Sequence, residues 1–325
     1  MKSMARVALT AVVLFLVELS SAGAQPDYST RPVRIVVPFA PGGVVDVMAR
    51  ILSQKLSDAF GQNFYIDNVG GAGGNIGTRV GAAAPKDGYT LVITSSSFVV
   101  NPNLHAKVPY DPVKDFTPIT IAATSPNVLV VNPGEPSNTV AELVESIKKS
   151  PDKYSFASAG VGTTPHLSGE LFKALTKVDI VHVPFASAGQ ALQSTAGGHT
   201  PIAFSALPPA VSLINSHAVK ALAVTSPKRM SVLPDVPTMA EQGFAGQETD
   251  TLLFVLAPAG VPSELVERLS GELRKILQAP DVQSRFDGLG FFALATSPEQ
   301  SAQRIKAELS KWNKVITDAN LKQTE

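Results

Sequence analysis

The stretch R-I-V-V-P-F-A-P-G-G-V-V-D, residues 34–46, decides how the rest of the chain is arranged. Residues 35–37 form an unbroken β-branched run, which is typical of a strand covered on both faces in a parallel sheet. Pro38 and Pro41 end the strand, because proline cannot donate to a sheet ladder. The two glycines that follow carry no Cβ, so another group can approach the backbone closely. This stretch therefore predicts a strand followed by a bare loop.

A helix is expected after the two glycines, because Met48, Leu52, Leu56 and Ala59 recur at steps of four, four and three. A glycine loop that leads into a helix leaves unpaired N–H groups at the positive end of the helix dipole. An anion can bind there without a cationic side chain. An ordinary strand-to-helix connection explains the same residues equally well. We expect Asp46 to start the helix rather than to act as a catalytic acid.

The N-terminus has the pattern of a secretory signal peptide. Basic residues precede an apolar run at residues 7–17, and an A-x-A site predicts cleavage between Ala24 and Gln25. The run is shorter than the roughly 20 residues that span a bilayer. The chain has no Cys, which excludes a disulfide framework and a lipid-modified N-terminal cysteine. We therefore expect export to the periplasm.

The charge balance gives no indication of nucleic acid or anionic lipid as a partner. The chain has 27 basic and 27 acidic residues, and removal of Lys2, Arg6 and Glu18 with the signal peptide leaves a formal charge of −1. The remaining length is sufficient for two domains of ordinary size.

Short strand candidates alternate with helix candidates along most of the chain, which predicts an α/β architecture with parallel sheets. The loop at residues 70–77 resembles a dinucleotide fingerprint, but Ile76 stands where the third glycine is required, so we reject a Rossmann cofactor site. The strand at residues 90–94 leads into three serines, at the end of a strand where open α/β sheets bind ligands. A serine-rich turn is the alternative interpretation.

Strands are expected at residues 119–123 and 127–131, on either side of a break at Ser125 and Pro126. We place the first crossing between domains at this break and the return crossing near Thr251. The expected divisions are the signal peptide at 1–24, domain 1 at 25–125 plus 254–325, and domain 2 at 126–253.

The opening pattern returns in the second domain. A strand at residues 154–158 precedes the bare loop at 159–162, with Thr164 as the expected N-cap and Pro165 as the first helical residue. Two strand ends, each followed by glycines and a helix N-terminus, are expected to face each other across a cleft. His166 lies in the first turn and could donate to a ligand, although a solvated histidine fits as well.

Further elements follow the same pattern. They are strands at 180–185, 202–205, 221–224 and 251–256, a turn at 207–209, a helix capped by Thr139 and Glu142, a helix carrying Leu167, Leu171 and Leu175, and helices at 190–196, 265–276 and from Ser297 onward with Trp312 inward.

Catalytic motifs are absent from the sequence: there is no G-x-S-x-G, no G-x-x-x-x-G-K and no H-E-x-x-H, and the five His residues lack metal-ligand spacing. Neither a metal nor a cofactor is expected. A secreted hydrolase remains an alternative, because triads are spatial rather than sequential. Binding fits the pattern better than turnover, so we expect no enzymatic activity.

Motifs along nearly the whole mature chain resemble one family in its own order. They are P-V-R-I-V-V-P-F-A-P-G-G-V-V-D, G-A-G-G-N-I-G, D-G-Y-T-L, N-P-N-L with P-Y-D-P-V-K-D-F, P-N-V-L-V-V-N-P, A-S-A-G-V-G-T-T-P-H-L-S-G-E-L-F, A-L-A-V-T-S-P-K-R with L-P-D-V-P-T, and L-A-P-A-G-V-P. They resemble the tripartite tricarboxylate transporter receptors, the Bug or TctC-like family. The resemblance implies a monomeric two-domain periplasmic-binding-protein fold (Venus flytrap, type II) with parallel-rich sheets and a cleft between domains. It also implies delivery of a small carboxylate to membrane permease subunits. A ligand sensor for a membrane histidine kinase is an alternative.

The resemblance further implies that two opposed loops hold a ligand carboxylate through backbone N–H groups, hydroxyls and bridging waters. The residues expected to bind the ligand are Phe39, Ala40, Pro41, Gly42, Gly43, Val45, Asn75, Ser95, Ser96, Ser97, Ala159, Gly160, Thr163, Thr164, His166, Phe185 and Ser205.

The sequence departs from the common family pattern at three places. Val45 replaces a frequent Thr, Phe185-Ala186 replaces Tyr-Lys, and Ser205-Ala206 replaces Asp-Asn. Burying a ligand ammonium group without a carboxylate partner is costly, so these changes predict a carboxylate ligand without an ammonium group. Glu248 and Asp250 are the residues that could still supply an acid.

Overall fold

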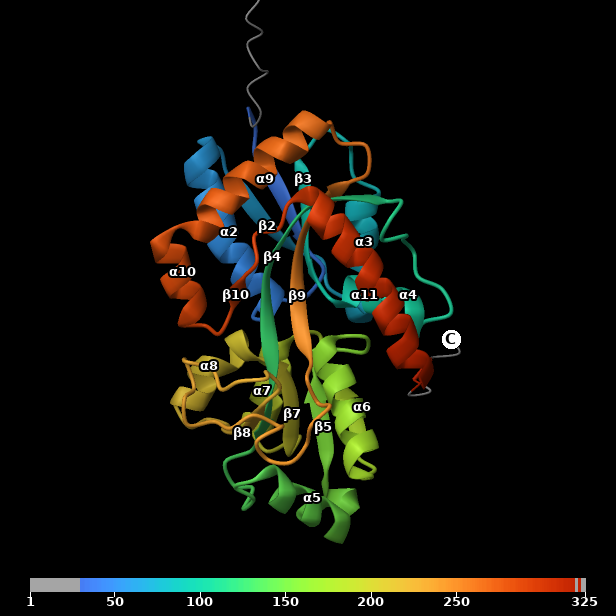
Figure 1. Cartoon of the computed structure of the whole chain (residues 1–325), viewed down its shortest axis with the longest axis vertical. Helices are drawn as coiled ribbons and strands as arrows, with labels where there is room; N and C mark the ends of the chain where they lie inside the picture. The colour runs from blue at the N-terminus through green and yellow to red at the C-terminus, as the bar shows by residue number, and fades with distance from the viewer. Residues whose placement is uncertain (1–29, 319–320, 323–325) are drawn as a thin grey trace, which may run out of the picture.

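The computed structural model describes residues 30–318 and 321–322. It shows an upper lobe and a lower lobe, with β4 and β9 running from one to the other (Figure 1). The expected signal peptide and its cleavage site lie outside the described residues. The strands are β1 (Val33–Val37), β2 (Phe64–Asn68), β3 (Thr90–Ser95), β4 (Phe116–Val131), β5 (Ser155–Ser158), β6 (Val181–Pro184), β7 (Ile202–Ala206), β8 (Lys220–Val224), β9 (Asp250–Pro258) and β10 (Phe292–Ala293). The helices are α2 (Val44–Phe60), α3 (Asn75–Ala82), α4 (Ser97–Leu104), α5 (Val140–Lys149), α6 (Thr164–Thr176), α7 (Ala188–Ala196), α8 (Leu207–Asn215), α9 (Ser263–Gln278), α10 (Pro280–Asp287) and α11 (Pro298–Asp318).

The upper lobe is built on the expected strand, loop and helix. β1 pairs in parallel with both β2 and β3. Alternate residues of β1 face opposite cores: Ile35 packs with α2 and α9, whereas Val36 packs with α4 and α11. The prediction of a strand covered on both faces is therefore confirmed. Trp312 of α11 is buried in the second of these cores, as expected.

The lower lobe repeats this arrangement with β5 parallel to β6 and β7. Leu129 of β4 packs with α5 and Phe156 on one face, and Val128 packs with α7 and α8 on the other. β4 and β9 are antiparallel to each other and to their other neighbours, so the sheet is mixed rather than purely parallel. The order of paired strands is β2-β1-β3-β9-β4-β7-β5-β6, with β8 and β10 also paired to β4.

The expected break at Ser125 and Pro126 is wrong. β4 runs through both residues without interruption, because they pair with Thr251 and Asp250 of the antiparallel β9. Proline lacks an N–H, but Pro126 keeps the extended backbone that β4 requires. A single long strand, and not two short ones, therefore passes from the upper to the lower lobe.

Several short helices were not expected, and they are α3, α4, α8 and α10. The expected turn at residues 207–209 is instead the first turn of α8. Proline is tolerated there because the first N–H groups of a helix have no intrahelical partner. By contrast, the expected cap of α11 is confirmed: Gln300 N–H donates to Ser297 Oγ at 3.1 Å, and Ser297 N–H donates to Gln300 Oε1 at 2.9 Å.

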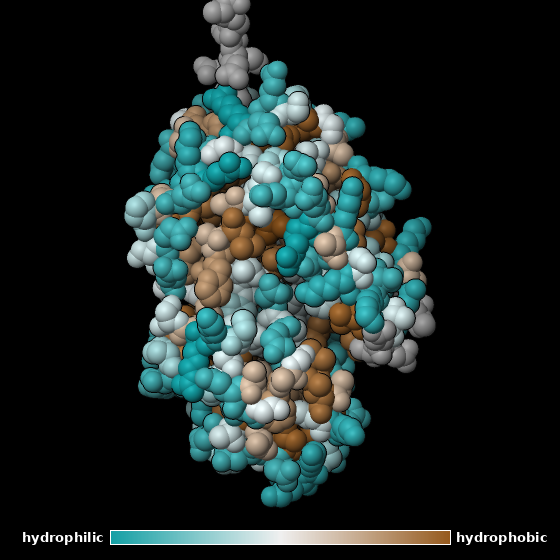
Figure 2. All heavy atoms as spheres, viewed as in Figure 1, coloured by the Kyte–Doolittle hydropathy of each residue, from teal (hydrophilic) through white to brown (hydrophobic). Residues whose placement is uncertain are grey.

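The surface of the face seen in Figure 1 is mainly hydrophilic, with smaller apolar patches between hydrophilic side chains (Figure 2). Among the described residues, no helix is long and apolar enough to cross a membrane, and no group of acidic or histidine side chains could hold a metal ion.

The inward face of α6 differs from the stripe of leucines that the sequence suggested. Leu175 is exposed, whereas Phe172 is fully buried. Gly169 allows this orientation, because a Cβ at this position would lie 2.1 Å from a ring carbon of Phe156. The helix therefore packs directly against the ring of Phe156.

We expect Gly169→Ala to destabilise the protein even though alanine is the better helix former. The added methyl group overpacks the contact with Phe156, which costs about 1–3 kcal/mol. Gly271→Ala in α9 is the matched control, because nothing lies within 4 Å of the added Cβ; it should stabilise by about 0.5–1 kcal/mol. Urea unfolding of the three proteins measures both changes, and equal shifts of the two variants would contradict the packing argument.

Candidate ligand-binding site

The loop between β1 and α2 is fixed from behind by the carboxylate of Asp46. Asp46 is 3% exposed and accepts hydrogen bonds from Gly42 N–H (3.1 Å), Arg50 Nε (2.9 Å) and Asn68 Nδ2 (3.0 Å). Asn68 Nδ2 also donates to the carbonyl of Phe39 at 3.0 Å. Burial acts to raise the pKa of Asp46, but the hydrogen bonds from Arg50, Gly42 and Asn68 outweigh it and lower that pKa. Asp46 lies in the first turn of α2, as expected, and organises the loop.

The opposed loop, between β5 and α6, is organised by Thr163. Its hydroxyl donates to Gly160 O (2.7 Å) and accepts from His166 N–H (3.4 Å), so Thr163 is the N-cap of α6. The prediction of Thr164 as the N-cap is therefore wrong by one residue, because Thr163 has the extended backbone that a cap requires. Thr164 is the first helical residue, and its hydroxyl is hydrogen-bonded to that of Thr251 on β9.

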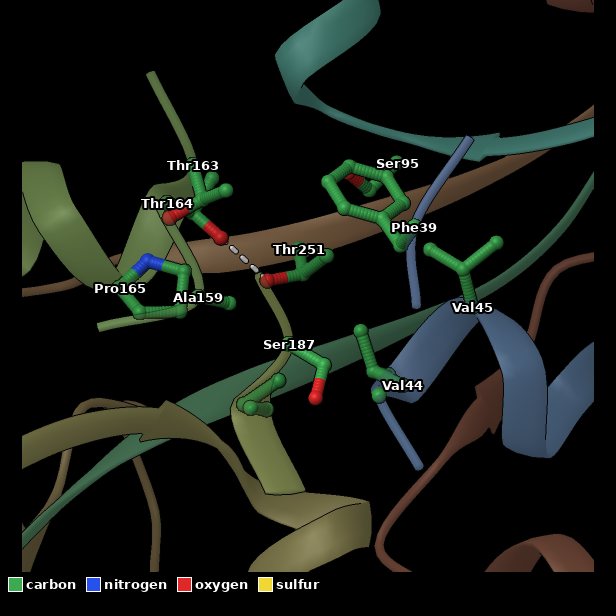
Figure 3. Close-up of a pocket in the computed structure, with 13 residues that line it drawn as sticks. Phe39, Val44, Val45, Ser95, Ala159, Thr163, Thr164, Pro165, Ser187 and Thr251 are labelled. Carbon is green, nitrogen blue, oxygen red and sulfur yellow. Dashed lines mark hydrogen bonds between the residues drawn. The ribbon is translucent and has the colours of Figure 1, made fainter. Parts of the chain in front are cut away.

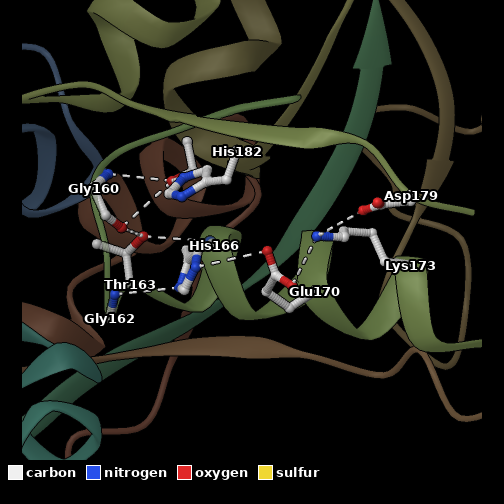
Figure 4. A network of polar contacts seen from close by, with 9 residues as sticks. Gly160, Gly162, Thr163, His166, Glu170, Lys173, Asp179 and His182 are labelled. Carbon is white, nitrogen blue, oxygen red and sulfur yellow. Dashed lines mark hydrogen bonds and ion pairs between the residues drawn. The ribbon is translucent and has the colours of Figure 1, made fainter. Parts of the chain in front are cut away.

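Two histidines, the buried His166 and the half-buried His182, support this loop (Figure 4). His166 Nδ1 accepts a hydrogen bond from Gly162 N–H at 3.3 Å, and His182 Nε2 lies 2.7 Å from Ser158 Oγ. The two rings are tilted at a centroid distance of 4.3 Å. His166 is 6% exposed, so the alternative of a solvated histidine is wrong.

Both imidazoles are neutral at neutral pH. Burial, followed by the nearby His182, lowers the pKa of His166 to about 3. Burial, followed by Lys173, lowers the pKa of His182 to about 4. His166 Nε2 lies 3.9 Å from Glu170 Oε1, but the neutral ring forms no ion pair with that carboxylate.

A small cavity of about 30 Å³ lies between the two loops (Figure 3). Three helices begin at its wall: α2 after Gly43, α6 after Thr163 and α7 after Ser187. The 13 residues that line the cavity, all in the described part of the chain, include no charged side chain. Its polar groups are hydroxyls and the N–H groups that the first turns of these helices leave without intrahelical partners.

Seven of the expected ligand-binding residues line this cavity: Phe39, Gly43, Val45, Ser95, Ala159, Thr163 and Thr164. The remaining lining residues are Val44, Pro165, Ser187, Ala188, Ala206 and Thr251, which are not among the residues expected to bind the ligand. The sequence does contain a signal for Ser187, because S-x-x-Q at residues 187–190 is the pattern of a helix N-cap. Ser187 Oγ accepts from Gln190 N–H at 3.3 Å.

A second space, which we call the outer groove, adjoins the cavity and has a volume of about 420 Å³. Phe39 and Ala159 line both spaces, and the groove also contains the expected Gly160 and Phe185. Its other walls come from the glycine-rich loop before α3 and from His105.

Eight expected residues line neither space: Ala40, Pro41, Gly42, Asn75, Ser96, Ser97, His166 and Ser205. Several of them instead form hydrogen bonds with neighbouring residues of the protein. Ser96 Oγ accepts from Leu252 N–H (2.8 Å), Asn75 Oδ1 accepts from Asn101 Nδ2 (2.8 Å), and Ser205 Oγ donates to the carbonyl of Ala206 (2.9 Å).

The neutral histidines should make stability pH-dependent. Free histidine has a pKa near 6.5, so the unfolded chain binds more protons than the folded one below that value, and stability falls as the pH drops toward 4. Between pH 6.5 and 5 we expect a loss of about 1.5 kcal/mol for His166 and a smaller loss for the half-buried His182. Denaturant unfolding across this range measures it.

The double variant His166→Asn, His182→Gln keeps hydrogen-bonding atoms near the original ring nitrogens and should flatten this dependence. His199→Gln, at an exposed histidine, is the control and should follow the wild-type curve. An unchanged slope in the double variant would show that other groups cause the loss.

The fold and the cavity between two lobes define a periplasmic binding protein. The solved structure of the periplasmic binding protein BugD matches with a TM-score of 0.88 at 34% identity, over 91% of this chain and 99% of that chain. The structure of R. palustris Rpa4515 with adipate matches with a TM-score of 0.88 at 35% identity, over 90% of this chain and 98% of that chain. The prediction of a two-domain periplasmic-binding-protein fold is confirmed.

The sequence comparisons identify the family. The model of the tripartite tricarboxylate transporter family receptor (TctC) matches residues 48–321. The UPF0065 protein in the tcbD-tcbE intergenic region of Pseudomonas sp. (strain P51) is 39% identical over 295 residues, which are 90% of this chain and 88% of the relative. The chain belongs to the tripartite tricarboxylate transporter receptor family, as its motifs predicted.

Proposed function

We propose that this protein is a periplasmic receptor that captures a small carboxylate in the cavity between its lobes and delivers it to the permease subunits of a tripartite tricarboxylate transporter. One observation carries the proposal. Three helix N-termini meet at a cavity whose described lining has no charged side chain.

This arrangement suits a carboxylate because the helix N-termini supply partial positive charge without a cation. Each dipole stabilises an anion by about 0.3–1 kcal/mol at exposed sites and by up to about 2 kcal/mol where burial reduces screening. The N–H groups of Val44, Val45 and Ala188 lie in first turns, where intrahelical partners are lacking. The hydroxyls of Ser95 and Ser187 complete the set of donors, whereas the Thr163 hydroxyl already donates to Gly160 O.

The ligand is proposed to carry no ammonium group. The cavity wall at the end of β7 is Ala206, and Ala188 and Val45 also line the cavity. Glu248 and Asp250, the two acids that could have altered this expectation, line a separate hollow beneath Trp312 of α11. A buried ammonium group would therefore lack a carboxylate partner, which is unfavourable.

Capture without turnover is proposed because no described lining residue can serve as a general base. His166 lies in the first turn of α6, but its Nδ1 accepts a hydrogen bond from Gly162 N–H and the residue does not line the cavity. The related proteins are solute-binding receptors. Conversion of a bound carboxylate to product, detected by chromatography, would contradict this part of the proposal.

Gly43→Leu should weaken carboxylate binding by at least about ten-fold, which corresponds to about 1.4 kcal/mol. A Cβ at Gly43 would lie 3.9 Å from Ala188 N, so a larger side chain fills the gap between the starts of α2 and α7. The carboxylate that most raises the melting temperature of the wild type is titrated by calorimetry. Gly271→Leu, which projects into open space, is the control; equal affinities for the two variants would exclude this loop as the carboxylate site.

We propose that the domains are residues 25–125 plus 254–325 and residues 126–253, with movement about β4 and β9 near Ser125 and Thr251. β4 pairs with β10 up to Thr124 and with β7 from Asn127 onward, so its partners change at Ser125 and Pro126, which supports the division. Small-angle scattering should show a smaller radius of gyration after a binding carboxylate is added. An unchanged radius at saturation would contradict this movement.

Export is proposed to proceed by cleavage after Ala24, in keeping with the periplasmic location of related binding proteins. A periplasmic species whose intact mass includes residues 1–24 would contradict it.

Uptake by a permease is favoured over sensing by a membrane histidine kinase because the matching family is one of transporter receptors. Co-purification with a kinase and not with a permease would reverse this choice. We also propose a monomer, which sedimentation can test.

A further inference from the structure

We propose that the ligand is a monocarboxylate with an apolar, preferably aromatic, body, and that this body passes between Phe39 and Ala159 into the outer groove and lies against Phe185. The inference rests on the proposed function, because it places the carboxylate in the inner cavity. The position of the two spaces carries it: they adjoin at Phe39 and Ala159, which line both of them.

Phe39 forms a fixed side of this passage. Its backbone carbonyl accepts from Asn68 Nδ2 at 3.0 Å, and the side chain is 6% exposed. Its ring lies against Gly74, where an added Cβ would come within 3.0 Å of the Phe39 Cζ atom. Ala159, on the other side, offers only a methyl group. The passage therefore admits a narrow or flat group, provided that the group is apolar.

The outer groove provides surfaces for an apolar body. Phe39, Pro184 and Phe185 line it, and Phe185 is half-buried at the end of β6. Aromatic rings gain about 0.5–1.5 kcal/mol from each other beyond the burial of area when they stack with an offset or meet edge to face. A ligand ring placed here would leave water without loss of any charged contact.

The outer groove does not suit a second carboxylate. Among the described residues that line it, only His105 has a titratable side chain, and burial lowers the pKa of His105. Gly74 N–H, in the adjoining glycine loop, already donates to Gly71 O at 3.1 Å. A second negative charge would thus enter a partly desolvated space without a cation, whereas an uncharged end would not.

Four acids test the proposal by calorimetry at neutral pH: propionate, hexanoate, adipate and 3-phenylpropionate. Hexanoate and adipate have the same number of carbon atoms and differ in the second carboxylate. We expect hexanoate and 3-phenylpropionate to bind at least about ten-fold more tightly than propionate. Adipate should bind more weakly than hexanoate. Tighter binding of adipate would overturn the choice of a monocarboxylate.

Phe185→Ala should lower the affinity for 3-phenylpropionate by about ten-fold and that for propionate by less than about two-fold. Phe292→Ala, at an exposed phenylalanine on β10, is the matched control and should change neither. Phe185→Leu keeps apolar bulk without the ring and should give an intermediate loss, which guards against a folding defect in the alanine variant.

The possible failures are distinguishable. If none of the four acids binds and no other carboxylate raises the melting temperature, the proposed function fails. If propionate binds and the larger acids gain nothing over it, or if Phe185→Ala reduces all affinities equally, the two-space inference fails while the carboxylate receptor stands.

Discussion

The site depends on a close approach between the backbones of the two lobes. A Cβ on Gly189 would lie 3.2 Å from Gly42 O, and a Cβ on Gly73 would lie 2.2 Å from Val161 O. Side chains cannot enter such contacts, so main-chain groups and short hydroxyls form most of the polar surface between the lobes. The absence of charged side chains from the described cavity lining follows from this geometry. A chain that brings helix N-termini this close has no need of a cation to bind an anion.

The charged side chain nearest the first loop, Asp46, contacts the loop backbone and does not line the cavity. The Asp46 carboxylate accepts from the backbone of Gly42 and is paired with Arg50, so it shapes the first loop and faces away from the ligand. His166 shapes the second loop as a neutral acceptor. Both side chains hold the backbone of a loop in place. Asp46 does so as a carboxylate whose charge is balanced by Arg50, and His166 does so as an uncharged ring. The field inside the cavity is then set by the helix dipoles.

Much of this could be predicted from sequence, because the signals are local. The strand, glycine loop and helix around residues 34–60 and the cap at Ser297 depend on neighbours a few positions away. The incorrect predictions concern segments whose secondary structure depends on residues far away in the sequence. Ser125 and Pro126 look like a break until β9 pairs with them, and Leu207 with its prolines can begin a helix or form a turn.

The site shows the same limit of sequence reasoning. Glycine and threonine motifs located both loops, yet nothing local shows that His166 is buried or that β9 passes beside the cavity. The N-cap was misplaced by one residue because Thr163 and Thr164 are chemically identical and only backbone geometry separates them. Seven expected residues line the cavity because they follow strand ends. The eight that do not line either space are mostly their sequence neighbours, whose side chains point elsewhere.

One of the strands that join the lobes, β9, is itself part of the cavity wall, which connects the cavity to the movement proposed about β4 and β9. Thr251 lines the cavity, pairs with Ser125 of β4, and shares a hydrogen bond with Thr164 at the start of α6. One turn further along α6, Ser168 Oγ is hydrogen-bonded to Asn127 of β4 at 2.9 Å. An anion at the α6 N-terminus therefore acts on a helix that is tied to both crossing strands. A ligand can shift the arrangement of the lobes only through interactions that differ between arrangements. In the proposed movement the facing N-termini supply such a difference, because α2 begins in one lobe and α6 and α7 begin in the other.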